Sequence, residues 1–191
     1  MAELYDAATA WQTLLCTEYE ITYGKKRVLH TLHLSFHPDQ FSHLSGIHHV
    51  DDIDLKIPFN KEKFFNKVLN HEFDNINLQN SIYWGDISGR LDAITKLQSI
   101  LDSDFVLYLF QRNILPFYSD IDANYLIKNP ATNDVVFLFL DGSSQSLFCR
   151  SVFTKSDRDY SCNQKSVVVL KKVKIKNNQA EIIFNKITES E

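Results

Sequence analysis

Four histidines lie within residues 36–49 of this chain: His37, His43, His48 and His49. Histidine is the side chain whose unperturbed pKa lies nearest to neutral pH, so such a cluster is a candidate for proton transfer or metal binding. His43 stands in the pattern Phe-x-His-Leu-x-Gly, beside small residues on a predicted short helix. It could therefore face a cleft and carry a proton. The alternative is a structural histidine that links this helix to a sheet.

Metal binding is the other chemistry that this stretch could support, because His43, His48 and His49 precede Asp51 and Asp52. A dedicated site needs ligands fixed on rigid elements, and no HExxH or similar helical spacing is present. The adjacent His48 and His49 also point in different directions on any regular element. We therefore expect general acid–base chemistry here, with no metal ion and no cofactor.

A second candidate lies in the strand predicted over residues 166–176. Strict alternation places Lys171 on one face of this strand together with Val167, Val169, Val173 and Ile175. A lone ammonium on an apolar face is costly unless it has a partner, so Lys171 could line a cleft and bind an anion. It could equally reach solvent along its aliphatic stem near a sheet edge.

The charge of the chain is unevenly distributed. Residues 150–176 contain eight basic and two acidic side chains, a charge of +6, so the other residues sum to −10 within the total of −4. A basic stripe on an acidic protein can mark an anionic partner. Lysines that protect a sheet edge from aggregation give the same pattern.

The segment 151–164 connects two predicted strands and is rich in cationic and hydrogen-bonding side chains, among them Tyr160. Loops on a rigid sheet often carry binding residues. An ordinary polar connection is the alternative.

The predicted secondary structure that positions these residues changes from helices to strands near residue 102. Helical periodicity predicts helices before that point, and period-two alternation predicts strands after it. The predicted helices span residues 3–19, 39–44, 60–70 and 86–101; the predicted strands span residues 19–23, 27–36, 105–110, 124–128, 134–140, 146–153, 166–176 and 180–187. The sequence thus predicts one α+β domain over residues 1–191, with helices packed on one face of a mostly antiparallel sheet.

The composition is that of an ordinary globular protein, 44% hydrophobic and 23% charged. The longest apolar run, over residues 135–140, is far too short for a membrane span, and the N-terminus lacks a secretory pattern. Cys16, Cys149 and Cys162 are odd in number and have no CxxC spacing. We therefore expect a reducing, cytoplasmic location and no membrane contact.

Two short motifs together resemble the phage barnase–EndoU–colicin–RelE-like nuclease family, within a superfamily of metal-independent ribonucleases. The first motif comprises Phe41, His43, Leu44, Gly46 and Ile47; the second comprises Phe153, Asp159, Tyr160 and Gln164, and leads into residues 169–172. The resemblance implies helices packed on an antiparallel sheet whose exposed face carries the active site.

The activity implied by the resemblance is cleavage of RNA by transesterification, in which the ribose 2′-oxygen attacks the adjacent phosphorus. His43 would act as base or acid, Lys171 or Arg150 would stabilise the phosphate charge, and Tyr160 with Gln164 would position the substrate. DNA would be a poor substrate because it lacks the 2′-hydroxyl.

The same resemblance implies that RNA is the partner, held by Arg150, Ser151, Lys155 and Gln164. A rival hypothesis is a catalytically inactive phage or mobile-element module that keeps its basic surface for a protein or nucleic acid partner. A third hypothesis is a toxin that a cognate inhibitor keeps inactive. The sequence leaves these alternatives open.

Overall fold

The computed structural model describes residues 3–73, 78–130, 135–154 and 158–187. The helices are α1 (Leu4–Leu14), η1 (Pro38–Gln40), α2 (Phe41–Leu44), η2 (Ile47–His49), α3 (Lys61–Leu69), η3 (Leu78–Asn80), α4 (Trp84–Asp102) and η4 (Arg112–Ile114). The strands are β1 (Thr17–Lys25), β2 (Val28–Leu34), β3 (Val106–Leu109), β4 (Tyr125–Lys128), β5 (Val136–Ser143), β6 (Ser146–Thr154), β7 (Lys165–Lys176) and β8 (Gln179–Asn185).

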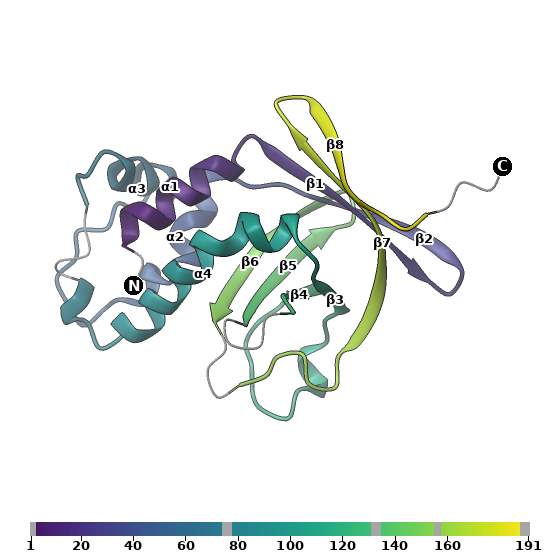
Figure 1. The fold of residues 1–191 in the computed structure, drawn as a ribbon. Helices are drawn as coiled ribbons and strands as arrows, with labels where there is room; N and C mark the ends of the chain where they lie inside the picture. The colour runs from purple at the N-terminus through teal and green to yellow at the C-terminus, as the bar shows by residue number, and fades with distance from the viewer. Residues whose placement is uncertain (1–2, 74–77, 131–134, 155–157, 188–191) are drawn as a thin grey trace.

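The strands form a closed barrel, so the expected open sheet with helices on one face is wrong. Seven strands follow the order β1-β2-β6-β5-β4-β3-β7, and the pairing of β7 with β1 closes the ring (Figure 1). β8 pairs with β7 and lies outside the ring. Alternation within each strand is the same in an open and a closed sheet. Closure depends on a pairing between segments at opposite ends of the chain, which no local pattern reports.

β7 makes this closure possible because it is long enough to serve three neighbours. One of its edges pairs with β1 from Val168 to Lys176. Its other edge pairs first with β3, up to Val167, and then with β8, from Lys171 onward. The long strand therefore belongs both to the ring and to the outer hairpin.

The weakest seam of the ring lies between β2 and β6. These two strands run parallel and share one bridge, Leu34 with Leu147, whereas the other pairs in the ring are antiparallel. The backbone N–H of Ser35 also donates to the Leu147 carbonyl oxygen at 3.1 Å. β2 ends at this bridge whereas β6 continues to Thr154, and α2 and α4 pack along β6.

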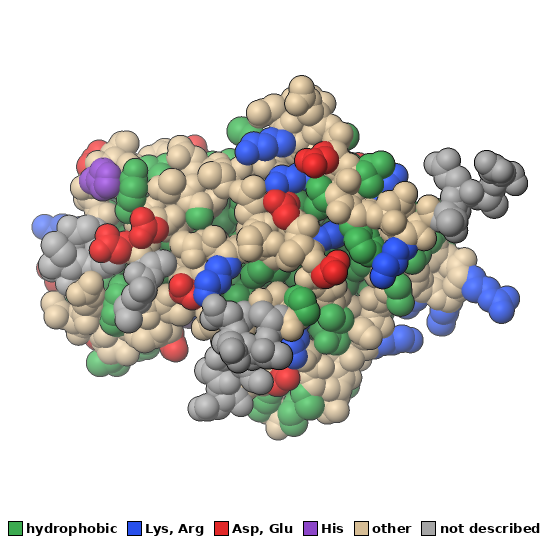
Figure 2. Space-filling model, viewed as in Figure 1, with side chains coloured by type: hydrophobic (Ala, Val, Ile, Leu, Met, Phe, Trp, Pro, Cys, Tyr) green, Lys and Arg blue, Asp and Glu red, His purple; other side chains and the backbone are tan. Residues whose placement is uncertain are grey.

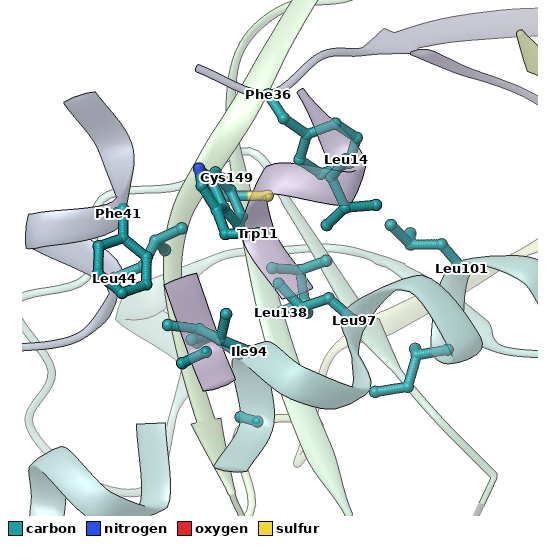
Figure 3. Close-up of a cluster of buried hydrophobic side chains, with 14 of the residues drawn as sticks. Trp11, Leu14, Phe36, Phe41, Leu44, Ile94, Leu97, Leu101, Leu138 and Cys149 are labelled. Atoms are coloured by element: carbon teal, nitrogen blue, oxygen red, sulfur yellow. The ribbon is translucent and has the colours of Figure 1, made fainter. Parts of the chain in front are cut away.

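The main core lies where α1 and α4 meet the inner face of the barrel (Figure 3). Trp11 of α1 is fully buried, and its indole N–H donates to the His37 carbonyl oxygen at 3.1 Å. Ile94 and Leu97 of α4 lie close to Leu138 of β5 in the same cluster. These contacts fix the start of the β2–α2 connection against the barrel.

A second, aromatic cluster covers the opposite face of β4 and β5. Its buried members are Phe110, Leu126, Val135, Phe137, Phe139 and Tyr160. Alternation explains the two clusters, because Leu138 faces the main core while its neighbours Phe137 and Phe139 face the aromatic cluster.

On the face of the molecule in Figure 2, acidic and basic side chains are interspersed rather than gathered into one patch. Within the described ranges, no helix is both long enough and apolar enough to cross a lipid bilayer.

Candidate functional site

A groove of about 1100 Å³ opens beside the first half of β6, where the chain leaves the end of β2. Three segments line it: the β2–α2 connection, the start of α3 with the residues before it, and the first half of β6. The lining residues are Ser35, His37, Pro38, Asp39, Gln40, His43, Phe59, Asn60, Lys61, Glu62, Ser146, Phe148, Cys149 and Arg150. The groove therefore collects histidine, basic, acidic and polar side chains from segments far apart in the sequence.

His43 reaches the groove because the other face of α2 is anchored. Pro38 starts the preceding turn of 3-10 helix, a position that suits its fixed φ. The ring of Phe41 is fully buried and packs against Phe64 and Phe65 of α3, with centroids 6.2 and 5.3 Å away. His43, two residues later, is only partly buried and lines the groove.

Gly46 ends this short helical segment with a φ of +77°. A Cβ at this position would lie 2.8 Å from Cδ of Arg90, closer than van der Waals contact allows. Glycine is therefore needed both for the left-handed backbone and for the close approach of Arg90.

The electrostatic setting of His43 keeps its imidazole neutral. Partial burial and the positive charges of Arg150, Lys61 and Arg90 lower the pKa of His43 from 6.5 to about 4. A neutral imidazole at pH 7 can accept a proton, and nearby cations can hold an anion. The groove thus places a neutral base beside these cations, with the carboxylates of Asp39 and Glu62 also in the lining.

The histidine rings of this segment form a stack. The His43 and His48 rings lie 4.4 Å apart at 28°, and those of His48 and His49 lie 3.9 Å apart. Partial burial and the neighbouring histidines also lower the pKa of His48 to about 4. Within this stack a positive charge is therefore disfavoured on His43 and on His48.

Arg90 of α4 connects this stack to β6, and sequence reasoning missed it. Its guanidinium carbon lies 4.2 Å from the centre of the Phe153 ring, and Nη1 lies 3.5 Å from Oγ of Ser151. Burial lowers the pKa of Arg90. The sequence held a signal for this residue, because Arg90 lies three residues after Ile87 and four before Ile94, on the apolar face of a predicted helix.

Arg150 enters the groove through an irregularity in β6. Cys149 pairs with Leu140 and Ser151 with Phe139, so Arg150 is the extra residue of a β-bulge. Its side chain is exposed and lines the groove, whereas Ser151 is buried beside Arg90.

Lys155, the third residue of this segment named from the sequence, lies outside the described residues. Nothing in the structure therefore tests its expected contact with RNA.

Tyr160 and Gln164 occupy positions away from the groove lining. Tyr160 is 8% exposed, and its ring stacks on Phe153 at 5.6 Å. The side-chain amide of Gln164 pairs with the backbone of Gln111, accepting from its N–H at 2.8 Å and donating to its carbonyl oxygen at 3.0 Å. Tyr160 thus contributes to the aromatic cluster, and Gln164 ties two loops together.

Asp159, beside Tyr160, belongs to a small polar network. Lys128 donates to its carboxylate at 3.3 Å, and the Ser161 hydroxyl donates at 2.5 Å. Partial burial opposes ionisation of Asp159, but the bonds from Ser161 and Lys128 outweigh it and lower its pKa. This network orders the turn that holds Tyr160.

Lys171 lies on the outer face of the barrel, because β7 contains a bulge. Tyr23 pairs with Val169 and Thr22 with Lys171, which leaves Leu170 as the extra residue. The bulge reverses the alternation, so Lys171 faces outward with Thr22 and is not among the residues that line the described groove. The expected apolar face containing Lys171 is therefore wrong.

Lys172 is the buried lysine of β7, with 2% of its surface exposed. Its Nζ donates to the carbonyl oxygens of Leu101 and Ser103, at 2.9 and 2.5 Å, at the C-terminal end of α4. Cations are favourable at this end of a helix. Lys172 thus holds α4 against the barrel wall.

Three further residues of the groove were not singled out from the sequence: Gln40, Phe59 and Lys61. His37 belonged to the histidine cluster, and Lys61 followed the predicted helix cap Asn60, which accepts from the Lys63 N–H at 2.9 Å. Nothing in the local pattern distinguished Gln40 or Phe59, because their placement depends on how α3 packs against α2.

Among the described residues, no three His, Cys, Asp or Glu side chains are placed together so that they could hold a metal ion.

Comparison with known proteins gives one match. A family model described as phage-Barnase-EndoU-ColicinE5/D-RelE like nuclease4 matches residues 3–189. No curated protein and no solved structure matches this chain.

Proposed function

Since this chain belongs to the phage-Barnase-EndoU-ColicinE5/D-RelE like nuclease4 family, we propose that it is a metal-independent endoribonuclease whose active site is the groove lined by His43, Lys61 and Arg150. The family description supports a nuclease of this type. Cleavage of RNA and its mechanism are our proposal, and they rest on the groove geometry.

In the first step, neutral His43 removes the proton from a ribose 2′-hydroxyl. The 2′-oxygen then attacks the adjacent phosphorus, and the bond from phosphorus to the 5′-oxygen breaks. The products are a 2′,3′-cyclic phosphate and a 5′-hydroxyl. With a pKa of about 4, His43 is unprotonated at neutral pH and can accept this proton.

The departing 5′-oxygen needs a proton, and the developing negative charge on the phosphate needs stabilisation. His37 lines the same groove and is our candidate for the acid. Arg150 and Lys61 also line it and provide the positive charge. A bound phosphate would offset these cations, so substrate binding should raise the pKa of His43 and strengthen it as a proton acceptor.

The single observation that carries the proposal is the convergence of His43 with Arg150 and Lys61 in one groove. The charges of these two cations act on the His43 imidazole. Arg150 enters the groove at a β-bulge, a feature that often re-aims side chains beside active sites. Tyr160 and Phe153 would act through Arg90, as positioning residues.

We further propose a cytoplasmic location and regulation by a protein that covers the groove, as for a toxin with a cognate inhibitor. The three cysteines are free thiols, which suits a reducing compartment. The acidic side chains of such an inhibitor protein would neutralise the positive charges of Arg150 and Lys61.

The proposal is tested by incubating the purified chain with mixed cellular RNA in the presence of EDTA. We expect cleavage that leaves cyclic phosphate ends, and no cleavage of DNA of the same sequence. His43→Ala should lower the rate by about 10²–10⁴-fold, because a proton-transfer group contributes that much. His30→Ala is the matched control, since His30 lies in β2 and stacks on Tyr23 at 5.2 Å.

Full activity of His43→Ala would contradict the proposed mechanism, in which His43 is the base. Activity abolished by EDTA and restored by a divalent cation would replace it with a metal-dependent one. RNA binding without cleavage by the unaltered chain would favour the inactive binding module.

A further inference from the structure

The most exposed large apolar side chain of the described chain stands in the groove. Phe59 has its full surface exposed (104%), and it lines the groove together with Asn60 and Lys61. Exposed single hydrophobic residues are common on proteins. A fully exposed phenylalanine beside cations in a large groove is not explained by this general rule.

The usual structural role for a residue at this position is not fulfilled. Phe59 directly precedes Asn60, the N-cap of α3. A hydrophobic residue there often packs against the fourth helical residue, here Phe64, and fixes the entry of the chain. Phe64 is instead fully buried against Phe41 and Phe73, with centroids 6.2 and 5.1 Å away. Both faces of the Phe59 ring are therefore exposed and available for stacking.

A second observation concerns Gln40, which lines the same groove. Its side-chain oxygen Oε1 is buried and has no hydrogen-bond partner among the described residues. An unsatisfied buried acceptor is rare in proteins and marks a place where a donor is missing. Because Gln40 lines the groove, a ligand bound there is a candidate for the missing donor.

We propose that the groove takes single-stranded RNA, with one unpaired base stacked on Phe59 and with Gln40 accepting from a ring or exocyclic N–H of a base. This inference rests on the proposed function and names its substrate class. Aromatic stacking needs a free base face, and Gln40 needs a free base edge, so a duplex satisfies neither requirement. The volume of about 1100 Å³ exceeds that of a typical site for one drug-sized molecule, which leaves room for more than one nucleotide.

The test measures binding separately from cleavage. Short RNA oligonucleotides with 2′-O-methyl riboses cannot be cleaved by attack of the 2′-oxygen, and their binding can be followed by fluorescence anisotropy at several salt concentrations. We expect Phe59→Leu to weaken single-strand binding by roughly 5- to 150-fold, the range measured for loss of one stacked base. Phe59→Trp should preserve binding, because it keeps an aromatic face.

The salt dependence distinguishes stacking from charge. Phe59→Leu removes no charge, so the slope of log affinity against log salt should stay unchanged. Arg150→Met should reduce this slope by about 0.7, the value for one phosphate contact on a single strand. A blunt-ended RNA duplex, which has no unpaired base, should bind weakly, and its affinity should be the same for the unaltered chain and for Phe59→Leu.

Tyr118→Leu is the matched control, because Tyr118 is 80% exposed on a loop and is not among the residues that line the described groove. Equal loss of binding in this control, equal affinity for Phe59→Leu and the unaltered chain, or equal binding of the blunt-ended duplex and the single strand would overturn the inference. Absence of any oligonucleotide binding would also overturn it. Binding that depends on Phe59, without cleavage of ordinary RNA, would support the inference and contradict the proposed function.

Discussion

The Arg90 guanidinium carbon lies 4.2 Å from the centre of the Phe153 ring, and Phe153 in turn stacks on Tyr160 with centroids 5.6 Å apart. The Arg90 stem also lies against the backbone of Gly46. The two short motifs that carry the family resemblance, one around His43 and one around Tyr160, therefore meet through a residue that belongs to neither. The Arg90 charge acts on His43 as well.

The first prediction concerns the charge state of His43. In a titration followed by NMR, its imidazole should show a pKa of about 4. Arg150→Met should raise this pKa toward 6.5, because removal of a nearby positive charge makes the imidazolium less unfavourable. His30→Ala should leave the His43 titration unchanged. The same pKa in Arg150→Met and the unaltered chain would show that Arg150 does not act on His43.

The pH dependence of RNA cleavage gives the second prediction. If His43 is the base, kcat/KM should fall on acidification only as the pH approaches about 4, where the imidazole becomes protonated. A histidine with an ordinary pKa would cause this fall near pH 6.5. The residual activity of His43→Ala should lack this acidic limb. A limb centred near pH 6.5 would contradict the assignment of the base.

The third prediction compares two adjacent lysines of β7. Lys172→Met should lower the free energy of unfolding by about 1–3 kcal/mol, because it leaves the Leu101 and Ser103 carbonyl oxygens without their donor. Lys171→Met should have little effect on stability, since Lys171 faces outward opposite Thr22. Urea denaturation measures both.

Lys171→Met also tests whether bound RNA is confined to the groove or extends to the outer face of β7. We expect Lys171→Met to cleave RNA at the rate of the unaltered chain, because Lys171 lies outside the groove lining. A large loss of turnover in a folded Lys171→Met variant would show that RNA extends from the groove to the outer face of β7.

Gly46→Ala provides the fourth prediction. Alanine at a φ of +77° costs about 1–2 kcal/mol, and its Cβ would also collide with the Arg90 side chain. We expect lower stability in thermal unfolding together with reduced cleavage, since Arg90 must move. Gly85→Ala is the control, because a Cβ there would meet no atom within 4 Å and Gly85 lies in α4. Unchanged activity in Gly46→Ala would show that the position of Arg90 is not critical.

The sequence alone determined most of the local structure. Alternation predicted the individual strands, and helical periodicity with caps such as Asn60 predicted α3 and α4, because these signals depend on neighbouring residues. The pattern around His43 pointed to the segment that lines the groove. The two motifs also indicated the family, which the match over residues 3–189 confirms.

The tertiary structure decided the closure of the sheet and the composition of the groove. Closure rests on the pairing of β7 with β1, and the groove rests on the placement of the β2–α2 connection and the start of α3 beside β6; both bring together distant parts of the chain. Two bulges, at Arg150 and Leu170, shift the alternation by one residue. One bulge brings Arg150 into the groove, and the other turns Lys171 outward and buries Lys172. A bulge is defined by the strand across from it, so strict alternation read along one strand assigns the wrong face to every residue beyond it.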